Sequence, residues 1–325
     1  MKKDYLISII VPVFNEEDSI ATFIKEINRT LGVIYDHLEI IFVNDGSNDR
    51  TVSEIHKVME SDQRVSLINF SKNFGQEAAL SAGLRLCRGD FAVPIDVDLQ
   101  DPPELVLEFL AKYEEGDGKY DTVYGYRADR SEDTWFKRFS AECFYHVFNL
   151  MSSKTKIPVN VGYFRLIDRR VINTINKLSE KHRYMKGLFA WSSHASCPVS
   201  YKRAERHAGT SKYNFWKLWN LALDGICSFS ATPLRICSYV GLFISSIAFL
   251  YMIFILAKTV YLGIDVPGYP SLLCVILFLG GIQLISIGLI GDYVGRIYYE
   301  VKDRPLYVID EIFGRLSKES NSPKQ

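Results

Sequence analysis

The stretch FAVPIDVDLQDPPE, residues 91–104, joins a short apolar run to a group of acids and a pair of prolines. The apolar run predicts a buried strand, and the prolines end it before a helix that begins near Glu104. Alternate side chains at an extended strand end point to the same side, so Asp96, Asp98 and Gln100 can face one site. Two carboxylates and an amide oxygen are hard ligands that suit Mg²⁺ or Mn²⁺, completed by substrate phosphates. A solvated acidic turn gives the same D-x-D pattern, but its position after a predicted strand favours the metal site.

Similar strand–helix units surround this stretch. Runs rich in Ile, Val and Phe, without strict alternation, predict strands covered on both faces at 6–14, 38–44, 65–70, 91–95 and 122–126. Apolar residues at helical spacing lie between them, which predicts an α/β fold, a mostly parallel sheet with helices on both faces. Ligands of such sheets lie beyond the carboxyl ends of the strands. This chain has acids there, in Asn15-Glu16, Asn44-Asp45 and Asp96-Val97-Asp98.

The composition and the missing motifs exclude several classes of protein. No G-x-G-x-x-G follows the first strand and no G-x-x-x-x-G-K-[ST] occurs, which disfavours dinucleotide dehydrogenases and P-loop nucleotidases. The six cysteines are scattered, so neither a zinc site nor a disulfide framework is expected. The 38 basic and 38 acidic residues balance, which leaves no global field to attract nucleic acid. We expect no secretory signal peptide, and 325 residues suit one catalytic domain plus an appendage.

The C-terminal part of the chain contains two long runs without a charged residue, at 236–257 and 266–291. Each is long enough to cross the roughly 30 Å of bilayer core, and soluble helices rarely run so far without a charge. We therefore predict two transmembrane helices, at about 236–257 and 270–291. Basic residues flank the pair on its outer sides, whereas the connecting loop has one Lys and one Asp. The positive-inside rule then places both chain ends, and the large N-terminal domain, in the cytoplasm.

The segment before the first span, 213–232, is broadly apolar and contains Trp216 and Trp219. This pattern predicts an amphipathic helix at the bilayer surface, anchored by its tryptophans; an ordinary core helix is the alternative. The predicted organisation is a cytosolic domain at 1–212, an interfacial helix at 213–232, a hairpin of two spans at 233–292 and a cytosolic tail at 293–325.

Three motifs resemble those of glycosyltransferase family 2 with the GT-A fold: VPVFNEE at 11–17, VNDGSND at 43–49 and DVDLQ at 96–100. The motifs SKNFG at 71–75 and RHAGTSKY at 206–213, with the two spans, are similar to polyprenyl-phosphate glycosyltransferases. Within these, the chain resembles the bactoprenol glucosyl transferases of O-antigen modification. The resemblance implies a Rossmann-like GT-A domain, a UDP-sugar donor, an undecaprenyl phosphate acceptor, a Mg²⁺ or Mn²⁺ cofactor and a place in the bacterial inner (plasma) membrane.

The resemblance also implies roles for single residues of the donor site. The nucleotide-sugar would contact Pro12, Phe14, Glu16, Asp45, Asp96, Val97 and Asp98. Among these, Asp45 would accept a hydrogen bond from the uracil ring, and Asp96 would hold the ribose or a water near the metal. Asp98 and Gln100 would bind the metal ion that bridges the diphosphate. Two structural alternatives stay open, because Asn-Asp-Gly-Ser at 44–47 is a common turn and Glu16 also suits a helix N-terminus.

The acceptor side needs cations to hold a lipid phosphate against the donor sugar. We expect the acceptor or the diphosphate to contact Arg127, Lys137, Arg138, Arg206, Ser211 and Lys212. Arginine clamps a phosphate with a planar fork, whereas lysine acts as a point charge. Lys137 and Arg138 suit a solvated helix face or attraction to anionic lipid equally well. The expected catalytic residues are Asp96, Asp98 and Arg127.

A phosphate acceptor also sets the expected mechanism. It is already anionic near neutral pH, so a strong general base is unnecessary. We expect one in-line displacement with inversion, helped by alignment of the substrates and by stabilisation of the leaving UDP. One departure from the family concerns the region of the reacting centre. Relatives usually carry Gly-Asp-Phe-Arg-Leu where this chain has GYFRL at 162–166, so Tyr163 replaces the acid expected near the reacting centre, a change that bears on the sugar specificity and on the turnover.

The expected function is the transfer of glucose, or a close hexose, from UDP to undecaprenyl phosphate for O-antigen or cell-surface polysaccharide modification. A related transfer of a modified aminopentose or an N-acetylhexosamine would share nearly every motif. A processive synthase is disfavoured because the chain has no Q-x-x-R-W. A non-catalytic lipid-carrier subunit is also disfavoured, because spans without ionisable residues give a polar head group no pathway. Small residues in the second span, such as Gly280 and Gly288, permit a homo-oligomer.

Overall fold

The computed structural model describes residues 5–127, 158, 161–181, 183–201, 232–262 and 268–320. Several predicted features lie outside these described residues. They are the candidate acceptor residues Lys137, Arg138, Arg206, Ser211 and Lys212, and all of the predicted interfacial helix except its last residue, Thr232.

The described residues form an eight-stranded sheet in the order β7-β5-β6-β4-β1-β2-β3-β8. Its strands are β1 Ile7–Val13, β2 Leu38–Asn44, β3 Val65–Phe70, β4 Phe91–Pro94, β5 Thr122–Arg127, β6 Val161–Asp168, β7 Ser196–Tyr201 and β8 Ile309–Phe313. The central strands β4, β1, β2 and β3 are parallel, and β1 pairs with β2 from Ile7 opposite Leu38 to Val13 opposite Asn44. The predicted α/β fold with a mostly parallel sheet is confirmed, and each of the five predicted strands is present.

Three strands were not predicted from the sequence. β6 runs antiparallel to both β4 and β5, β7 is parallel to β5, and β8 runs antiparallel to β3 at the opposite edge. For β7 and β8, the two edge strands, the missing signal has a local cause. β7, SCPVSY, contains a proline and is partly exposed, while β8, IDEIF, has two exposed acids in its middle. Edge strands carry little hydrophobic pattern, because only one side of such a strand has a neighbour in the sheet.

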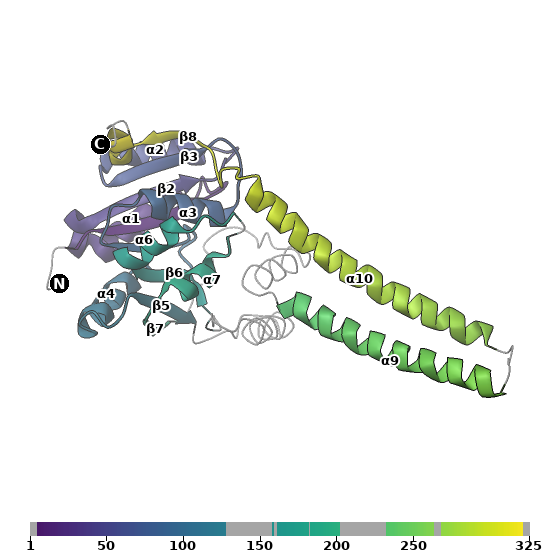
Figure 1. The fold of residues 1–325 in the computed structure, drawn as a ribbon. Helices are drawn as coiled ribbons and strands as arrows, with labels where there is room; N and C mark the ends of the chain where they lie inside the picture. Colours follow the sequence, from purple (N-terminus) through teal and green to yellow (C-terminus); the bar gives the residue numbers. More distant parts are fainter. Residues whose placement is uncertain are drawn as a thin grey trace. The chain divides into compact units, whose positions relative to one another are not determined.

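Helices cover both faces of the sheet. They are α1 Ile20–Leu31, η1 Gly32–His37, α2 Thr51–Ser61, α3 Gln76–Leu86, α4 Leu105–Glu115, α6 Arg169–Lys177, α7 Met185–Ser192 and α11 Arg315–Ser320 (Figure 1). Ile9 packs in one buried cluster with Phe23 of α1 and Phe109 of α4. On the opposite face, Ile10 lies so close to Gly83 of α3 that any side chain at Gly83 would collide with it. Successive side chains of β1 point to opposite faces of the sheet, so the strand packs against helices on both faces.

The chain divides into two compact units. One comprises Met1–Gly225 with Pro305–Gln325, and the other comprises Ile226–Arg304. The C-terminal tail thus supplies β8 to the sheet of the first unit. Tyr307 stacks on Phe70 at the end of β3, with ring centroids 5.0 Å apart, and the backbone N–H of Ser71 donates to the carbonyl of Val308. The sequence predicts a cytosolic tail at 293–325, and residues 309–313 of this tail form a strand of the first unit's sheet.

The second unit contains the long helices α9 Thr232–Leu262 and α10 Tyr269–Val301. Within α10, Phe278–Val301 is long and apolar enough to cross a membrane, with a mean hydropathy of 1.4. Within α9, Ser238–Tyr251 is apolar but shorter. The two helices contain the whole of the predicted spans at 236–257 and 270–291 and extend beyond them.

Candidate functional site

The carboxyl ends of β1, β2 and β4 lie at one edge of the sheet, because these strands are parallel and adjacent. Asp45 directly follows β2, is 5% exposed, and donates its backbone N–H to the carbonyl of Val13. Its carboxylate accepts hydrogen bonds from the backbone N–H groups of Phe74 at 2.6 Å and of Gly75 at 2.9 Å. Burial raises the pKa of Asp45, while these two N–H groups oppose the rise. The Asp45 carboxylate thus holds the loop after β3 against the end of β2.

Two glycines allow this close approach. Gly46 has a φ of +71°, and a Cβ there would lie 2.5 Å from the backbone carbonyl carbon of Lys72. Gly75 has a φ of +95° and precedes the first turn of α3. Positive φ favours glycine at both positions. The motifs at 43–49 and 71–75, distant in sequence, therefore form one continuous surface next to the strand ends.

The first strand contributes Pro12 and Phe14, which are both half-buried near its carboxyl end. Asn15 accepts from the backbone N–H of Asn48, which ties this end to the turn after β2. The Glu16 carboxylate accepts a hydrogen bond from the Ser19 hydroxyl at 3.1 Å, just before α1. Glu16 therefore contacts the residue that precedes α1, while the first turn of α1 itself carries no acid.

The acids after β4 follow the predicted alternation. Asp96, Asp98 and Gln100 are half-buried, whereas Val97 and Leu99 between them are 5% and 8% exposed and belong to the core. A contact between Val97 and a nucleotide would therefore come from its backbone. Asp98 accepts from the backbone N–H of Gln100 at 3.2 Å, and Leu99 takes a φ of 56° in this turn.

The side-chain oxygens of Asp98 and Gln100 are suitable ligands for a hard divalent cation. Their carboxylate and amide oxygens belong to residues separated only by Leu99, and both side chains are partly exposed at the edge where ligands of parallel sheets bind. Among the described residues, no three His, Cys, Asp or Glu side chains gather as a complete metal cage. This donor set suits Mg²⁺ or Mn²⁺, which usually keep waters and substrate phosphates in the coordination shell.

Arg127, at the end of β5, is held by two groups that sequence reasoning did not identify. Its Nε donates to the Tyr201 hydroxyl at 3.3 Å, and its guanidinium lies 3.9 Å from the Asp101 carboxylate. Tyr201 donates to Asp101 at 2.5 Å. Burial lowers the pKa of Arg127, but Tyr201, Asp101 and Asp96 together raise it above its ordinary value. The guanidinium is therefore a fixed positive charge close to the acids after β4.

Sequence reasoning also missed the first turn of α3. The side-chain amide of Gln76 donates to Asp96 Oδ1 at 3.0 Å. The adjacent Glu77 accepts a hydrogen bond from the Tyr163 hydroxyl at 2.7 Å. The signal that could have located them is the motif SKNFG at 71–75, which directly precedes both residues.

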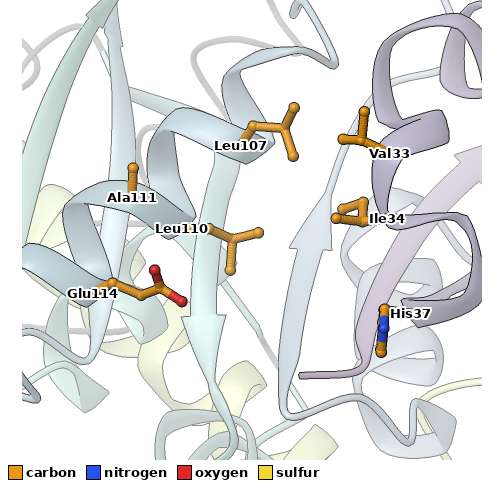
Figure 2. A pocket seen from close by; sticks show the side chains of 7 residues that line it. All are labelled: Val33, Ile34, His37, Leu107, Leu110, Ala111 and Glu114. Atoms are coloured by element: carbon orange, nitrogen blue, oxygen red, sulfur yellow. The ribbon is translucent and has the colours of Figure 1, made fainter. Parts of the chain in front are cut away.

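A pocket elsewhere on the domain lies away from these acids (Figure 2). Val33, Ile34 and His37 line one side of it, and Leu107, Leu110, Ala111 and Glu114 of α4 line the other. His37 immediately precedes the first residue of β2, so the pocket lies toward the amino ends of the strands. It is therefore distinct from the candidate site at the carboxyl ends.

Comparison with known proteins gives matches to two family models. Residues 8–175 match glycosyl transferase family 2, and residues 232–297 match the GtrB C-terminal hairpin. The SfII prophage-derived bactoprenol glucosyl transferase of Shigella flexneri is 50% identical over 303 residues, which cover 93% of this chain and 97% of that protein. A prophage bactoprenol glucosyl transferase homolog of Escherichia coli K12 is 48% identical, with 94% and 99% covered. An uncharacterized glycosyltransferase of Synechocystis is also 48% identical, with 95% and 96% covered.

Proposed function

The chain belongs to glycosyl transferase family 2, and we propose that it transfers glucose, or a close hexose, from a UDP donor to undecaprenyl phosphate. The observation that carries the proposal is the match to bactoprenol glucosyl transferases over more than nine tenths of both chains. The geometry supports it, because Asp45 and the acids after β4 lie at one edge of a parallel sheet. That edge is where nucleotide ligands of such sheets bind.

The donor site we propose spans three strand ends. The uracil ring would bind near Asp45, with Pro12 and Phe14 beside it, and Asp96 would contact the ribose. Asp98 and Gln100 would hold a Mg²⁺ or Mn²⁺ ion, which when bound neutralises charge on the diphosphate. Arg127 adds a fixed positive charge close to Asp96, suited to the diphosphate or the acceptor phosphate.

The chemistry needs positioning more than proton transfer. An acceptor phosphate is anionic near neutral pH, so its oxygen can attack the anomeric carbon without a strong base. The work of Asp45 and Arg127 is then to fix the nucleotide and to stabilise charge on the leaving UDP. We propose a single displacement with inversion at the anomeric carbon.

The hairpin supports a reaction at a membrane. The match of residues 232–297 to the GtrB C-terminal hairpin, together with the apolar stretch Phe278–Val301, supports membrane association. We propose that both helices span the bacterial inner membrane, that both chain ends are cytoplasmic, and that the basic residues at 206–212 meet the lipid phosphate near the headgroups.

The test is transfer of labelled sugar from a panel of UDP-sugars to undecaprenyl phosphate by the full-length protein in detergent. The panel contains UDP-glucose, UDP-galactose, UDP-N-acetylglucosamine and a UDP-aminopentose, each with Mg²⁺, Mn²⁺ or EDTA. Metal-dependent labelling from UDP-glucose, with a β-linked product by NMR, supports the proposal. Labelling from another donor alone identifies a sister reaction, and labelling from none by folded protein contradicts it.

A further inference from the structure

The strand order sets out where each part of a nucleotide-sugar would lie. β1 lies between β2, which Asp45 directly follows, and β4, which leads to Asp98, and β6 is the next strand on the other side of β4. A donor with its base near Asp45 and its diphosphate near Asp98 therefore directs its sugar toward β6. β6 opposes β4 with Asp168 across from Phe91 and Ile167 across from Ala92. Because the two strands are antiparallel, Tyr163, which precedes Ile167 in β6, lies toward the carboxyl end of β4.

Side-chain contacts place Tyr163 at the same edge. Consecutive residues of α3 reach the two sides of the site: Gln76 donates to Asp96 at 3.0 Å, and Glu77 accepts from the Tyr163 hydroxyl at 2.7 Å. The other oxygen of Glu77 accepts from the backbone N–H of Met185 at 2.8 Å, at the start of α7. Donors from β6 and from α7 thus fix the Glu77 carboxylate on both oxygens.

This arrangement determines what the Tyr163 hydroxyl can offer to a ligand. A phenol has one proton, and here the proton is directed to Glu77, so toward a further partner the oxygen acts as an acceptor. The Lys186 ammonium lies 5.3 Å from the centroid of the Tyr163 ring, within cation–π range. A sugar hydroxyl suits this patch, because it can donate to the phenolic oxygen. A phosphate dianion does not, because its oxygens only accept hydrogen bonds and the single phenol proton is already directed to Glu77.

We propose that Tyr163, oriented by Glu77, is a specificity-determining residue that accepts a hydrogen bond from a hydroxyl of the donor sugar. Tyr163 contacts the sugar, while Glu77 is a positioning residue that acts through it. The inference rests on the proposed function, since it requires a nucleotide-sugar donor. It adds to that function a residue that discriminates between sugars.

The test measures binding, so it does not depend on turnover. Full-length protein in detergent with Mg²⁺ is titrated with UDP, UDP-glucose and the four UDP-deoxyglucoses that lack the hydroxyl at C2, C3, C4 or C6. The wild type should bind one deoxy donor about 3- to 10-fold more weakly than UDP-glucose, the size of one hydrogen bond. Tyr163→Phe should bind UDP-glucose more weakly by the same factor and no longer distinguish that deoxy donor. Its affinity for UDP should not change.

Two further variants separate a contact from a structural effect. Tyr113→Phe removes a phenol on α4, where the ring packs edge-on against Phe91, and should leave all affinities unchanged. Glu77→Gln should weaken discrimination among the deoxy donors while UDP affinity is retained, because an amide can donate to the phenol and reverse its role.

Each remaining outcome has a definite meaning. If Tyr163→Phe still distinguishes UDP-glucose from the deoxy donor as well as the wild type does, the inference is overturned and the proposed function stands. Loss of UDP affinity in Tyr163→Phe also overturns it, because the role would then be structural. A folded wild type that binds neither UDP nor UDP-glucose contradicts the proposed function itself.

Discussion

The carboxylate of Asp45 accepts a hydrogen bond from the backbone N–H of Gly75 at 2.9 Å, across 30 residues of sequence. Through it, the end of β2 and the loop before α3 become one rigid surface. The same loop leads into the turn from which Gln76 reaches Asp96. One buried carboxylate therefore sets the relative position of two parts of the proposed donor site.

We expect Asp45→Asn to lower both stability and UDP affinity. The amide keeps one acceptor oxygen, so one of the N–H groups of Phe74 and Gly75 faces an NH₂ group instead of an acceptor. A buried unsatisfied donor costs about 1–3 kcal/mol of unfolding free energy. Thermal unfolding and UDP titration of the full-length protein measure the two effects. The exposed Asp36→Asn is the control, and an unchanged melting temperature in Asp45→Asn would contradict this account.

Arg127 should matter for both the fold and the reaction. Arg127→Met leaves the carboxylate of Asp101, which is 3% exposed, with Tyr201 but without the neighbouring cation. We expect a loss of about 1–3 kcal/mol in stability, the cost of an incompletely paired buried charge. Arg127→Lys keeps a charge and should recover most of the stability but less of the transfer rate, because the fork geometry is lost. Equal transfer rates in the wild type and Arg127→Lys would show that the fork has no role.

The C-terminal tail should stabilise the catalytic domain. Tyr307 stacks on Phe70, and its burial raises the pKa of the phenol. Tyr307→Ala should cost about 2–3 kcal/mol, somewhat less than the loss of a fully buried ring. Tyr307→Phe keeps the stack and serves as the matched control. Denaturant unfolding measures both variants, and wild-type stability in Tyr307→Ala would mean that β8 contributes little to the sheet.

Cysteine reactivity should report on the packing of the domain. Burial raises the pKa of Cys87 to about 11, so the thiol stays protonated in the folded protein well above neutral pH. Iodoacetamide at about pH 8.5, near the ordinary thiol pKa, should modify Cys87 only after unfolding, whereas the less buried Cys197 should react in the folded state. Because the folded pKa is raised, the stability contributed by the neutral thiol is present at lower pH and is lost as pH rises toward about 11. Peptide mass spectrometry distinguishes the two cysteines, and early labelling of Cys87 would contradict its burial.

The parts of the site that depend on local pattern could be predicted from sequence. The alternation of half-buried Asp96, Asp98 and Gln100 with buried Val97 and Leu99 follows from the two-residue period of an extended chain. Asp45 at a strand end follows from the apolar run before it. Both inferences need only a few neighbouring residues.

The contacts between distant segments could not be predicted in the same way. Arg127 meets Tyr201 because β5 pairs with β7, which lies more than 70 residues later. β8 joins β3 from beyond the hairpin, and its acidic sequence gives no strand signal. Glu77 carries no pattern of its own, and only the approach of β6 to α3 brings it to Tyr163. Such pairings depend on the order of strands in the sheet, which local periodicity does not encode.

The most direct test of the central claim compares the wild type with Asp98→Asn in transfer of radiolabelled glucose from UDP-glucose to undecaprenyl phosphate. Both full-length proteins are purified from the membrane fraction, checked for equal thermal unfolding, and assayed with Mn²⁺. We predict a labelled lipid phosphate from the wild type and at least a 10²-fold lower rate from Asp98→Asn, about the size of a lost electrostatic contact to the leaving group. Equal rates from the two proteins, or no labelled lipid from folded wild type with any donor, would contradict the assignment of a metal-dependent donor site to the edge beyond β4.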